Sequence, residues 1–229
     1  MNFAHESTLI ELQNFMKEKF KNINLNESCK LVSDNWNREK PTNDKEYNIF
    51  YEKDTDYIFE ISNFSNSVRR KKIFIKLKKV LNENNIKNII DFGAGVGSDT
   101  IELHKNNFNV KYLEINEIMK KFFEYRCKIR NITIPTIEKI EKTECIMFVD
   151  VIEHFKNPFD YLKKFCDNSK YLLFTQSFGE HDENRGGMPY HTDYKMHDII
   201  KYLIDNGFEK IKIKQAFPPY LFKKNGDNI

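Results

Sequence analysis

The stretch IIDFGAGVGSDTIEL, residues 89–103, decides how the chain is interpreted, because it places three of the eight glycines within five positions. A short apolar segment precedes these glycines, and a segment with helical spacing follows them. Glycine reaches backbone angles that other residues avoid, and it has no Cβ to keep a ligand away from the backbone. The stretch therefore predicts a strand, a tight turn and a helix, with a ligand close to the turn.

Apolar segments of strand length alternate with helical segments from residue 63 onward, which predicts an α/β fold with a doubly wound sheet. Pro135 places its own segment at a sheet edge, because proline cannot donate a hydrogen bond to a neighbouring strand. We therefore expect a Rossmann-like, mostly parallel, seven-stranded sheet. Its strands are expected at residues 88–92, 109–115, 132–137, 145–150, 170–176, 208–214 and 220–224. Helices are expected at residues 64–84, 98–106, 116–128, 158–167 and 193–206.

Residues 1–62 have a different pattern, which predicts an N-terminal helical cap on a main domain at 63–229. Leu9, Leu12, Phe15 and Met16 recur at helical spacing. The segment has no glycine and contains the only tryptophan, Trp36. We expect its aromatic side chains to line part of a ligand pocket, and the candidates are Trp36, Tyr47, Tyr51 and Tyr57.

Composition limits the classes of function. The 229 residues carry a formal net charge of only +3, which does not by itself indicate a nucleic-acid partner. We find no signal peptide and no apolar run long enough to span a membrane, so we expect a cytoplasmic protein. The four cysteines form no CxxC pair, which argues against structural zinc.

The residues around the glycine turn indicate which ligand it holds. Nicotinamide and flavin sites carry a GxGxxG fingerprint, whereas Gly93, Gly95 and Gly97 are one residue closer together. Asp91 stands two residues before the first glycine, where a carboxylate suits a cation better than a pyrophosphate. S-adenosylmethionine fits this site better, because it has a sulfonium and an ammonium group and no phosphate.

Two further acids are expected at the ends of neighbouring strands. Glu114 ends the second expected strand, where a carboxylate can accept hydrogen bonds from both ribose hydroxyls. Asp150 ends the fourth expected strand and faces the same cleft. Three acids in register at strand ends indicate an S-adenosylmethionine site more strongly than the glycines alone.

The segments DFGAGVG, LEIN and FVDVIEHF resemble successive motifs of class I S-adenosylmethionine-dependent methyltransferases. DVIEHF is most similar to the small-molecule branch that includes ubiquinone-pathway and sugar methyltransferases. The resemblance covers residues 86–215 and implies an antiparallel final strand, for which residues 220–224 are available. It also implies a set of cofactor-binding residues, with Glu138 as a candidate beside the adenine. By this resemblance the methionine portion would contact Asp91, Gly93, Gly95 and Gly97. The ribose would contact Glu114, and the adenine would contact Ile115 and Asn116. Asp150 and Val151 would lie beside the cofactor on the substrate side.

Methyl transfer requires a base only if the acceptor must lose a proton. We expect His154 or His191 to be that base, among candidates that also include Glu153, His181 and Tyr190. The polar loop 179–191 follows a strand, and Gly186 and Gly187 could hinge it as a lid. We expect no metal site, because His181 and His191 are ten residues apart without helical or strand spacing.

The expected reaction is therefore methyl transfer from S-adenosylmethionine to a small-molecule acceptor, at oxygen rather than nitrogen or carbon. Two alternatives remain open. Seven of the eleven residues in RRKKIFIKLKK, 69–79, are basic, which would suit an RNA or protein methyltransferase. A non-catalytic module that keeps the cofactor fold is the other alternative. FPPY, 217–220, is interpreted as a turn.

Overall fold

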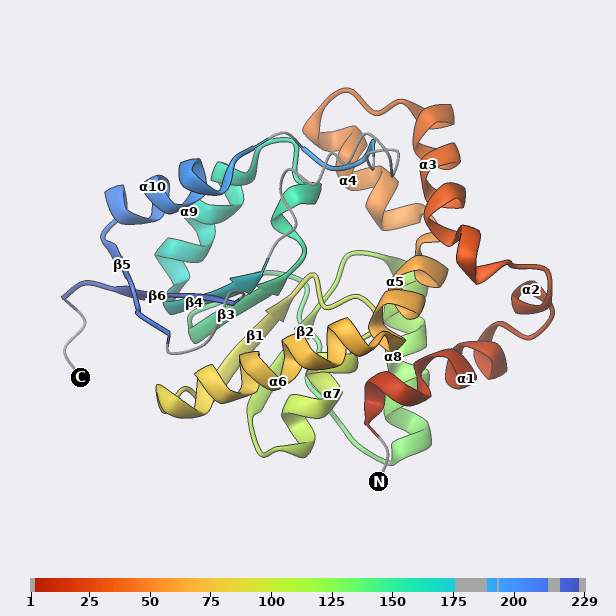
Figure 1. The fold of residues 1–229 in the computed structure, drawn as a ribbon, viewed down its shortest axis with the longest axis horizontal. Helices are drawn as coiled ribbons and strands as arrows, with labels where there is room; N and C mark the ends of the chain where they lie inside the picture. The colour runs from red at the N-terminus through yellow and green to blue at the C-terminus, as the bar shows by residue number, and fades with distance from the viewer. Residues whose placement is uncertain (1–2, 176–188, 193, 214–218, 227–229) are drawn as a thin grey trace.

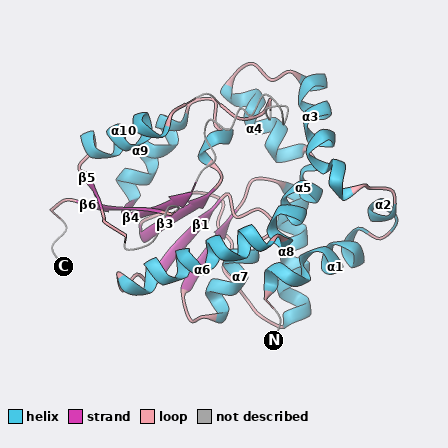
Figure 2. Cartoon of the chain, viewed as in Figure 1, coloured by secondary structure: helices cyan, strands magenta, loops and turns pink. Residues whose placement is uncertain are grey.

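The computed structural model describes residues 3–175, 189–192, 194–213 and 219–226 (Figure 1). Within these residues six strands form one sheet in the order β2-β1-β3-β4-β6-β5. The strands are β1 (Asn88–Phe92), β2 (Asn109–Leu113), β3 (Thr143–Val149), β4 (Ser169–Thr175), β5 (Phe208–Lys210) and β6 (Tyr220–Lys224). Helices cover both sides of the sheet (Figure 2). The α/β class and the Rossmann-like, mostly parallel sheet are confirmed.

The strand order reverses beside β1, and this reversal fixes where a ligand can bind. Strand β1 pairs in parallel with β2 on one side and with β3 on the other. Strand β4 continues the parallel set beyond β3, whereas β6 is antiparallel to both β4 and β5. The expected antiparallel final strand is thus present. Crevices form at the carboxyl ends of strands at such a reversal point.

The expected third strand, 132–137, is the main difference between the described residues and the predicted sheet. Only one parallel bridge forms there, between Tyr112 and Thr136. Tyr112 donates its backbone N–H to the carbonyl of Pro135, and Ile137 donates to the carbonyl of Tyr112. Pro135 has no N–H of its own to extend a ladder, so the segment lies along β2 without becoming a strand. The described sheet therefore has six strands rather than seven.

The expected helix at 64–84 is also two helices, α5 (Tyr57–Asn66) and α6 (Val68–Glu83). Ser67 separates them with an extended backbone, and its side chain accepts a hydrogen bond from the backbone N–H of Arg70. Ser67 is thus the N-cap of α6. The expected boundary between cap and main domain, at residue 62, falls inside α5.

Two apolar cores lie on opposite faces of the sheet. In β1, Ile89 belongs to one core and Ile90 to the other, as the two-residue period of a strand requires. Helices α6, α7 (Ser98–Lys105) and α8 (Glu117–Arg130) cover the first face. Helices α9 (Pro158–Asn168) and α10 (Met196–Asp205) cover the second.

The amino-terminal residues are helical, and they are called the cap below. It comprises α1 (Ala4–Met16), α2 (Glu18–Lys21), η1 (Leu25–Glu27), α3 (Ser28–Glu39), α4 (Asp44–Lys53) and α5. A third apolar core joins the cap to the main domain, because Val96, Met119 and Phe122 belong to the same cluster as the cap residues. In it Trp36 packs edge-to-face against Tyr47 and Phe50. Helices α3 to α5 stand at the end of the sheet toward which β1 points (Figure 1).

Gly97 fixes the packing of the turn that joins β1 to α7. Its φ is +70°, in the left-handed region. A Cβ at this position would lie 2.2 Å from Cδ2 of Phe123 on α8. Gly97 therefore lets α8 pack directly against the turn, whatever its relation to a ligand. In the same structure Gly207 has a φ of +81° and open space around it.

We expect Gly97→Ala to lower the free energy of unfolding by about 2–4 kcal/mol, the sum of left-handed strain and overpacking. The matched control is Gly207→Ala, which adds the backbone strain alone and is expected to cost about 1 kcal/mol. Urea unfolding followed by circular dichroism measures both values. Equal losses for the two variants would show that Phe123 moves aside and that the close packing is not required.

Candidate functional site

A single cavity at the carboxyl ends of β1, β2 and β3 brings together most of the residues expected in the site. The empty space in it, counted together with the open solvent at its mouth, is about 1010 Å³. The glycine turn forms its floor, while Tyr51 of α4 and Tyr57 of α5 approach it from the cap. The expected residues that line it are Asp91, Gly93, Gly95, Glu114, Ile115, Asp150, Val151 and His154.

The turn after β1 is held tightly against neighbouring backbone. The N–H groups of Gly93 and Ala94 both donate to the carbonyl of Leu113, at 2.9 and 3.2 Å. A Cβ on Gly93 would lie 2.8 Å from both Cγ atoms of Val151. Gly93 and Gly95 both have positive φ angles, which favour glycine. The sequence therefore requires glycine here for conformation and for close approach.

Glu114 joins the end of β2 to the glycine turn. One carboxylate oxygen accepts the backbone N–H of Gly95 at 2.7 Å. The other accepts the N–H groups of Ile115 and Asn116 at 2.8 and 2.9 Å. Burial raises the pKa of Glu114, and these three donors act in the opposite direction. A carboxylate can accept about four hydrogen bonds, so Glu114 keeps acceptor capacity toward the cavity.

Asp91 lies at the centre of the cavity floor with only 3% of its surface exposed. Its carboxylate accepts a hydrogen bond of 2.5 Å from the hydroxyl of Thr100. Burial raises the pKa of Asp91 to about 7, with a further contribution from the negative charge of Asp99. The group is therefore close to half-ionised near neutral pH and would gain from a neighbouring cation.

Arg70 and Asp99 form an ion pair at the cavity wall that the sequence analysis did not identify. Both residues line the cavity, and the Nη2 of Arg70 donates to Asp99. Burial alone would raise the pKa of Asp99, but Arg70 and His5 outweigh it and lower this pKa. Arg70 belongs to the basic run 69–79, whose helical spacing gave no sign that one member turns inward.

Asp150 and Val151 follow β3 on the other side of the turn. Asp150 has a φ of +53°, an uncommon angle for an aspartate, and accepts the hydroxyl of Thr175 at 3.0 Å. Burial raises its pKa, while Arg70 acts to lower it. Asp91, Asp99 and Asp150 thus line the same cavity as Arg70, which pairs directly with Asp99.

His154 stands between two tyrosine hydroxyls from the cap. Its Nδ1 lies 2.9 Å from the hydroxyl of Tyr51, and its Nε2 lies 3.2 Å from that of Tyr57. The Tyr51 hydroxyl donates its proton to the carbonyl of Tyr190, at 2.8 Å. It must therefore accept from His154, which places the imidazole proton on Nδ1 and leaves a lone pair on Nε2. Burial and the neighbouring His191 hold the pKa of His154 well below its usual range.

Three expected site residues lie outside the cavity lining. Gly97 packs against Phe123 as described above. Asn116 is 1% exposed, caps α8 by accepting from Met119, and donates to the carbonyls of Tyr51 and Asp54. The ring of His191 meets that of His154 edge-to-face, with centroids 4.7 Å apart. Asn116 thus joins the cap to α8, and His191 packs against His154, the candidate base.

Other candidates from the sequence are distributed as follows. Tyr51 and Tyr57 line the cavity, whereas Trp36 and Tyr47 pack in the core of the cap. Glu138 is not part of the lining and lies 3.8 Å from Lys120. Glu153 is buried below the lining. His181, Gly186 and Gly187 lie outside the described residues, as does most of the expected lid.

Two features are absent from the described part of the chain. No cluster of three or more metal-ligating side chains occurs there. None of the described helices is long and apolar enough to cross a membrane.

Comparison with known proteins identifies the family. Residues 65–211, well over half of the chain, match the family model described as a methyltransferase domain. The chain belongs to this methyltransferase family. Its cofactor is S-adenosylmethionine, as the motif analysis expected, and not a nicotinamide or flavin. A comparison with curated proteins found no significant match by sequence.

Solved structures share the fold of this methyltransferase at low sequence identity. Magnesium protoporphyrin IX methyltransferase from Synechocystis, solved with bound S-adenosylmethionine, is 16% identical, with a TM-score of 0.57. That match covers 86% of this chain and 97% of the other. A methyltransferase from Clostridium acetobutylicum is 14% identical over 73% of this chain and 98% of its own, also with a TM-score of 0.57. One from Aquifex aeolicus is 19% identical over 74% and 95%, with a TM-score of 0.53.

We expect cofactor affinity to rise as the pH increases through 7, because Asp91 must be ionised to hold a cationic group. Binding near pH 7 should release about half a proton, since the cofactor lowers a pKa that starts at about 7. Calorimetric titration in buffers of different ionisation enthalpy measures this release. Asp91→Asn should bind more weakly and lose this part of the pH dependence. Equal proton release by the variant and the wild type would rule out Asp91 as its source.

Proposed function

We propose that this methyltransferase transfers the methyl group of S-adenosylmethionine to an oxygen atom of a small-molecule acceptor. The observation that carries the proposal is the neutral imidazole of His154, held with its Nε2 lone pair toward Tyr57 in a cavity covered by the cap. The cofactor supplies a methyl group already activated by the sulfonium. The protein must therefore align the acceptor, exclude water and receive a proton.

The charges of the cavity fit the cofactor. S-adenosylmethionine carries a sulfonium, an ammonium and a carboxylate, and its net charge is positive. Among the described residues, the cavity lining offers Asp91, Asp99, Glu114 and Asp150 against the one guanidinium of Arg70. An acid-rich site with one cation therefore matches both the net charge and the internal polarity of the ligand.

Particular residues then suit particular parts of the cofactor. Asp91 would accept hydrogen bonds from the ammonium group, and Glu114 from the ribose hydroxyls. Arg70 would hold the carboxylate through Nη1, which is buried and has no hydrogen-bond partner among the described residues. Ile115, 40% exposed beside the cavity, offers an apolar surface to the adenine. Gly93, Gly95, Asp150 and Val151 would shape the floor and the substrate side.

The acceptor would enter between the cofactor and the cap, where Tyr51, Tyr57, Phe64 and Phe155 line the cavity. His154 Nε2 would take the hydroxyl proton of the acceptor. The methyl carbon would bond to the acceptor oxygen as its bond to the sulfonium sulfur breaks, which leaves the cofactor as the neutral thioether S-adenosylhomocysteine. The proton arrives directly if the acceptor takes the place of the Tyr57 hydroxyl, or through that hydroxyl if it does not. Tyr51 keeps the imidazole oriented by accepting from Nδ1.

An oxygen acceptor is favoured because its methylation requires the loss of one hydroxyl proton, which a neutral imidazole can accept. The lowered pKa of His154 keeps Nε2 unprotonated at neutral pH, ready to accept a hydroxyl proton. Aromatic side chains around it offer stacking surfaces to an acceptor with a planar body.

The alternative of an RNA or protein acceptor loses support from the basic helix. Arg70 turns inward to Asp99, while Lys71, Lys78 and Lys79 contact Glu6, Asn106 and Glu83. Asp99, Glu6 and Glu83 offset three of the seven positive charges of this run and so reduce the positive surface that a polymer would meet. A purely non-catalytic module would not require an oriented neutral histidine in the cavity.

We expect His154→Asn to lower kcat by about 10²–10⁴-fold, with an unchanged dissociation constant for S-adenosylmethionine, because the variant loses only the proton acceptor. His197→Ala is the control, since His197 is 73% exposed on α10 and contacts Asp198. The assay follows label transfer from the methyl-labelled cofactor to a panel of hydroxyl-bearing small molecules, RNA and peptides.

Mass spectrometry of the product then locates the methylated atom. Methylation of RNA or peptides with no transfer to any hydroxyl compound would contradict the proposal. Full turnover of His154→Asn at saturating acceptor would remove His154 from the mechanism.

A further inference from the structure

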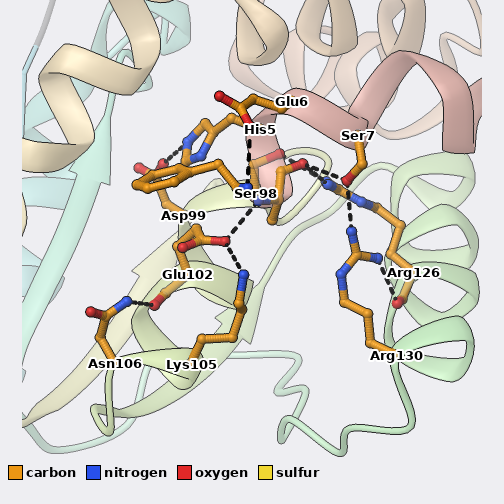
Figure 3. Close-up of polar contacts among 12 residues, drawn as sticks. His5, Glu6, Ser7, Ser98, Asp99, Glu102, Lys105, Asn106, Arg126 and Arg130 are labelled. Atoms are coloured by element: carbon orange, nitrogen blue, oxygen red, sulfur yellow. Dashed lines mark hydrogen bonds and ion pairs between the residues drawn. The ribbon is translucent and has the colours of Figure 1, made fainter. Parts of the chain in front are cut away.

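Helix α1 is joined to the main domain by a buried polar network rather than by apolar packing alone (Figure 3). Arg126 of α8 is fully buried and donates to the carbonyl of Ala4, to Thr8 and to Glu11. Glu102 of α7 accepts the backbone N–H of Ala4 at 2.7 Å. These contacts hold the first turns of α1 in one place against α7 and α8.

His5 extends this network to the wall of the cofactor cavity. The ring is fully buried, and its Nε2 lies 2.7 Å from one carboxylate oxygen of Asp99. The other oxygen of Asp99 accepts from Arg70. An ionised carboxylate can only accept, so both neighbours donate to it. Asp99 thus receives one donor from α1 and one from α6, and it lies between them.

The three side chains depend on one another for their positions. Asp99 is 4% exposed, so it stays ionised only while hydrogen bonds and a positive charge replace water. His5 supplies one of those hydrogen bonds and is confined by the rings of Phe3 and Phe74. The position of Asp99 in turn fixes Arg70, whose other terminal nitrogen, Nη1, has no hydrogen-bond partner among the described residues.

We propose that His5 is a positioning residue for the cofactor, acting through Asp99 to hold the guanidinium of Arg70 against the carboxylate of S-adenosylmethionine. The inference rests on the role proposed above for Arg70. It makes α1, which precedes the region matched by the family model, a functional part of the cofactor site. Without His5, Asp99 and Arg70 would occupy several arrangements, and the carboxylate of the cofactor would lose a preorganised partner.

The test compares two ligands by calorimetry, S-adenosylmethionine and 5′-methylthioadenosine. The second ligand keeps the adenosine and the sulfur atom but lacks the carboxylate and the ammonium. Arg70→Ala should weaken S-adenosylmethionine binding by about 10- to 100-fold, the effect of losing a charged hydrogen-bonded pair. Its affinity for 5′-methylthioadenosine should stay within about twofold.

His5→Phe keeps an aromatic ring among Phe3 and Phe74 and removes the hydrogen bond to Asp99. We expect it to weaken S-adenosylmethionine binding by about 3- to 10-fold and to leave 5′-methylthioadenosine unaffected. His5→Gln, which keeps a donor, should recover most of the affinity. In the Arg70→Ala background, His5→Phe should have no further effect, because the two act through one contact.

The matched control is Glu11→Gln, which loosens the other end of α1 by weakening the pairs with Arg126 and Arg130. It should change the two affinities equally or not at all. Equal loss of both ligands in His5→Phe would mean that His5 only supports the fold, and it would overturn the proposal. The proposal would also be overturned if Arg70→Ala selectively weakened S-adenosylmethionine binding while His5→Phe left both affinities unchanged. The proposed role of Arg70 would then stand. If Arg70→Ala left the affinity for S-adenosylmethionine unchanged, the proposed role of Arg70 itself would be wrong.

Discussion

The site depends on one constraint, the burial of several carboxylates at the carboxyl end of the sheet. Asp91 and Asp99 are both less than 5% exposed, and a buried charge destabilises the fold unless donors or cations compensate it. The two acids are compensated differently. Asp99 pairs with Arg70 and His5, and its pKa is lowered. Asp91 accepts a hydrogen bond from the Thr100 hydroxyl, and Arg70 also acts to lower its pKa, but burial outweighs both and raises it to about 7. The fold therefore favours the ionised form of Asp99, whereas Asp91 would gain from a cationic ligand, as proposed above for the ammonium group of the cofactor.

The cap completes the site from the other side, and its contacts are polar where function requires orientation. Asn116 joins α8 to the carbonyls of Tyr51 and Asp54, so the same contact that fixes the cap also places Tyr51. Tyr51 in turn orients His154. The direction of the two hydrogen bonds of the Tyr51 hydroxyl follows from the carbonyl of Tyr190, which can only accept. A backbone atom of the segment after β4 thus determines which nitrogen of His154 carries the proton.

The sequence was sufficient for the parts of the site that are contiguous in the chain. The strand, the glycine turn and Glu114 all lie between residues 88 and 116, where local periodicity and glycine spacing carry the information. The inward turn of Arg70 was missed, because the helical pattern of 69–79 looks the same whichever basic residue finds a buried partner. The roles of His5 and of the two tyrosines beside His154 were also missed, since they depend on contacts across about 90 to 140 positions. Pro135 indicated an edge position correctly, but the single bridge at Thr136 showed that the missing N–H prevents a strand altogether.

This division between local and distant residues also limits what the relatives can reveal about the acceptor. The residues proposed to bind the cofactor come mainly from one continuous segment, and the family model begins only at residue 65. The proposed acceptor side of the cavity is lined from α4, α5 and the 3₁₀ turn η2 (Ile152–His154), so much of it precedes the matched region. Structures at 14–19% identity share the sheet and carry no information about side chains in such a cap. The acceptor of this methyltransferase must therefore be sought through Tyr51, Tyr57 and His154, the residues that the cap and η2 bring over the cofactor site.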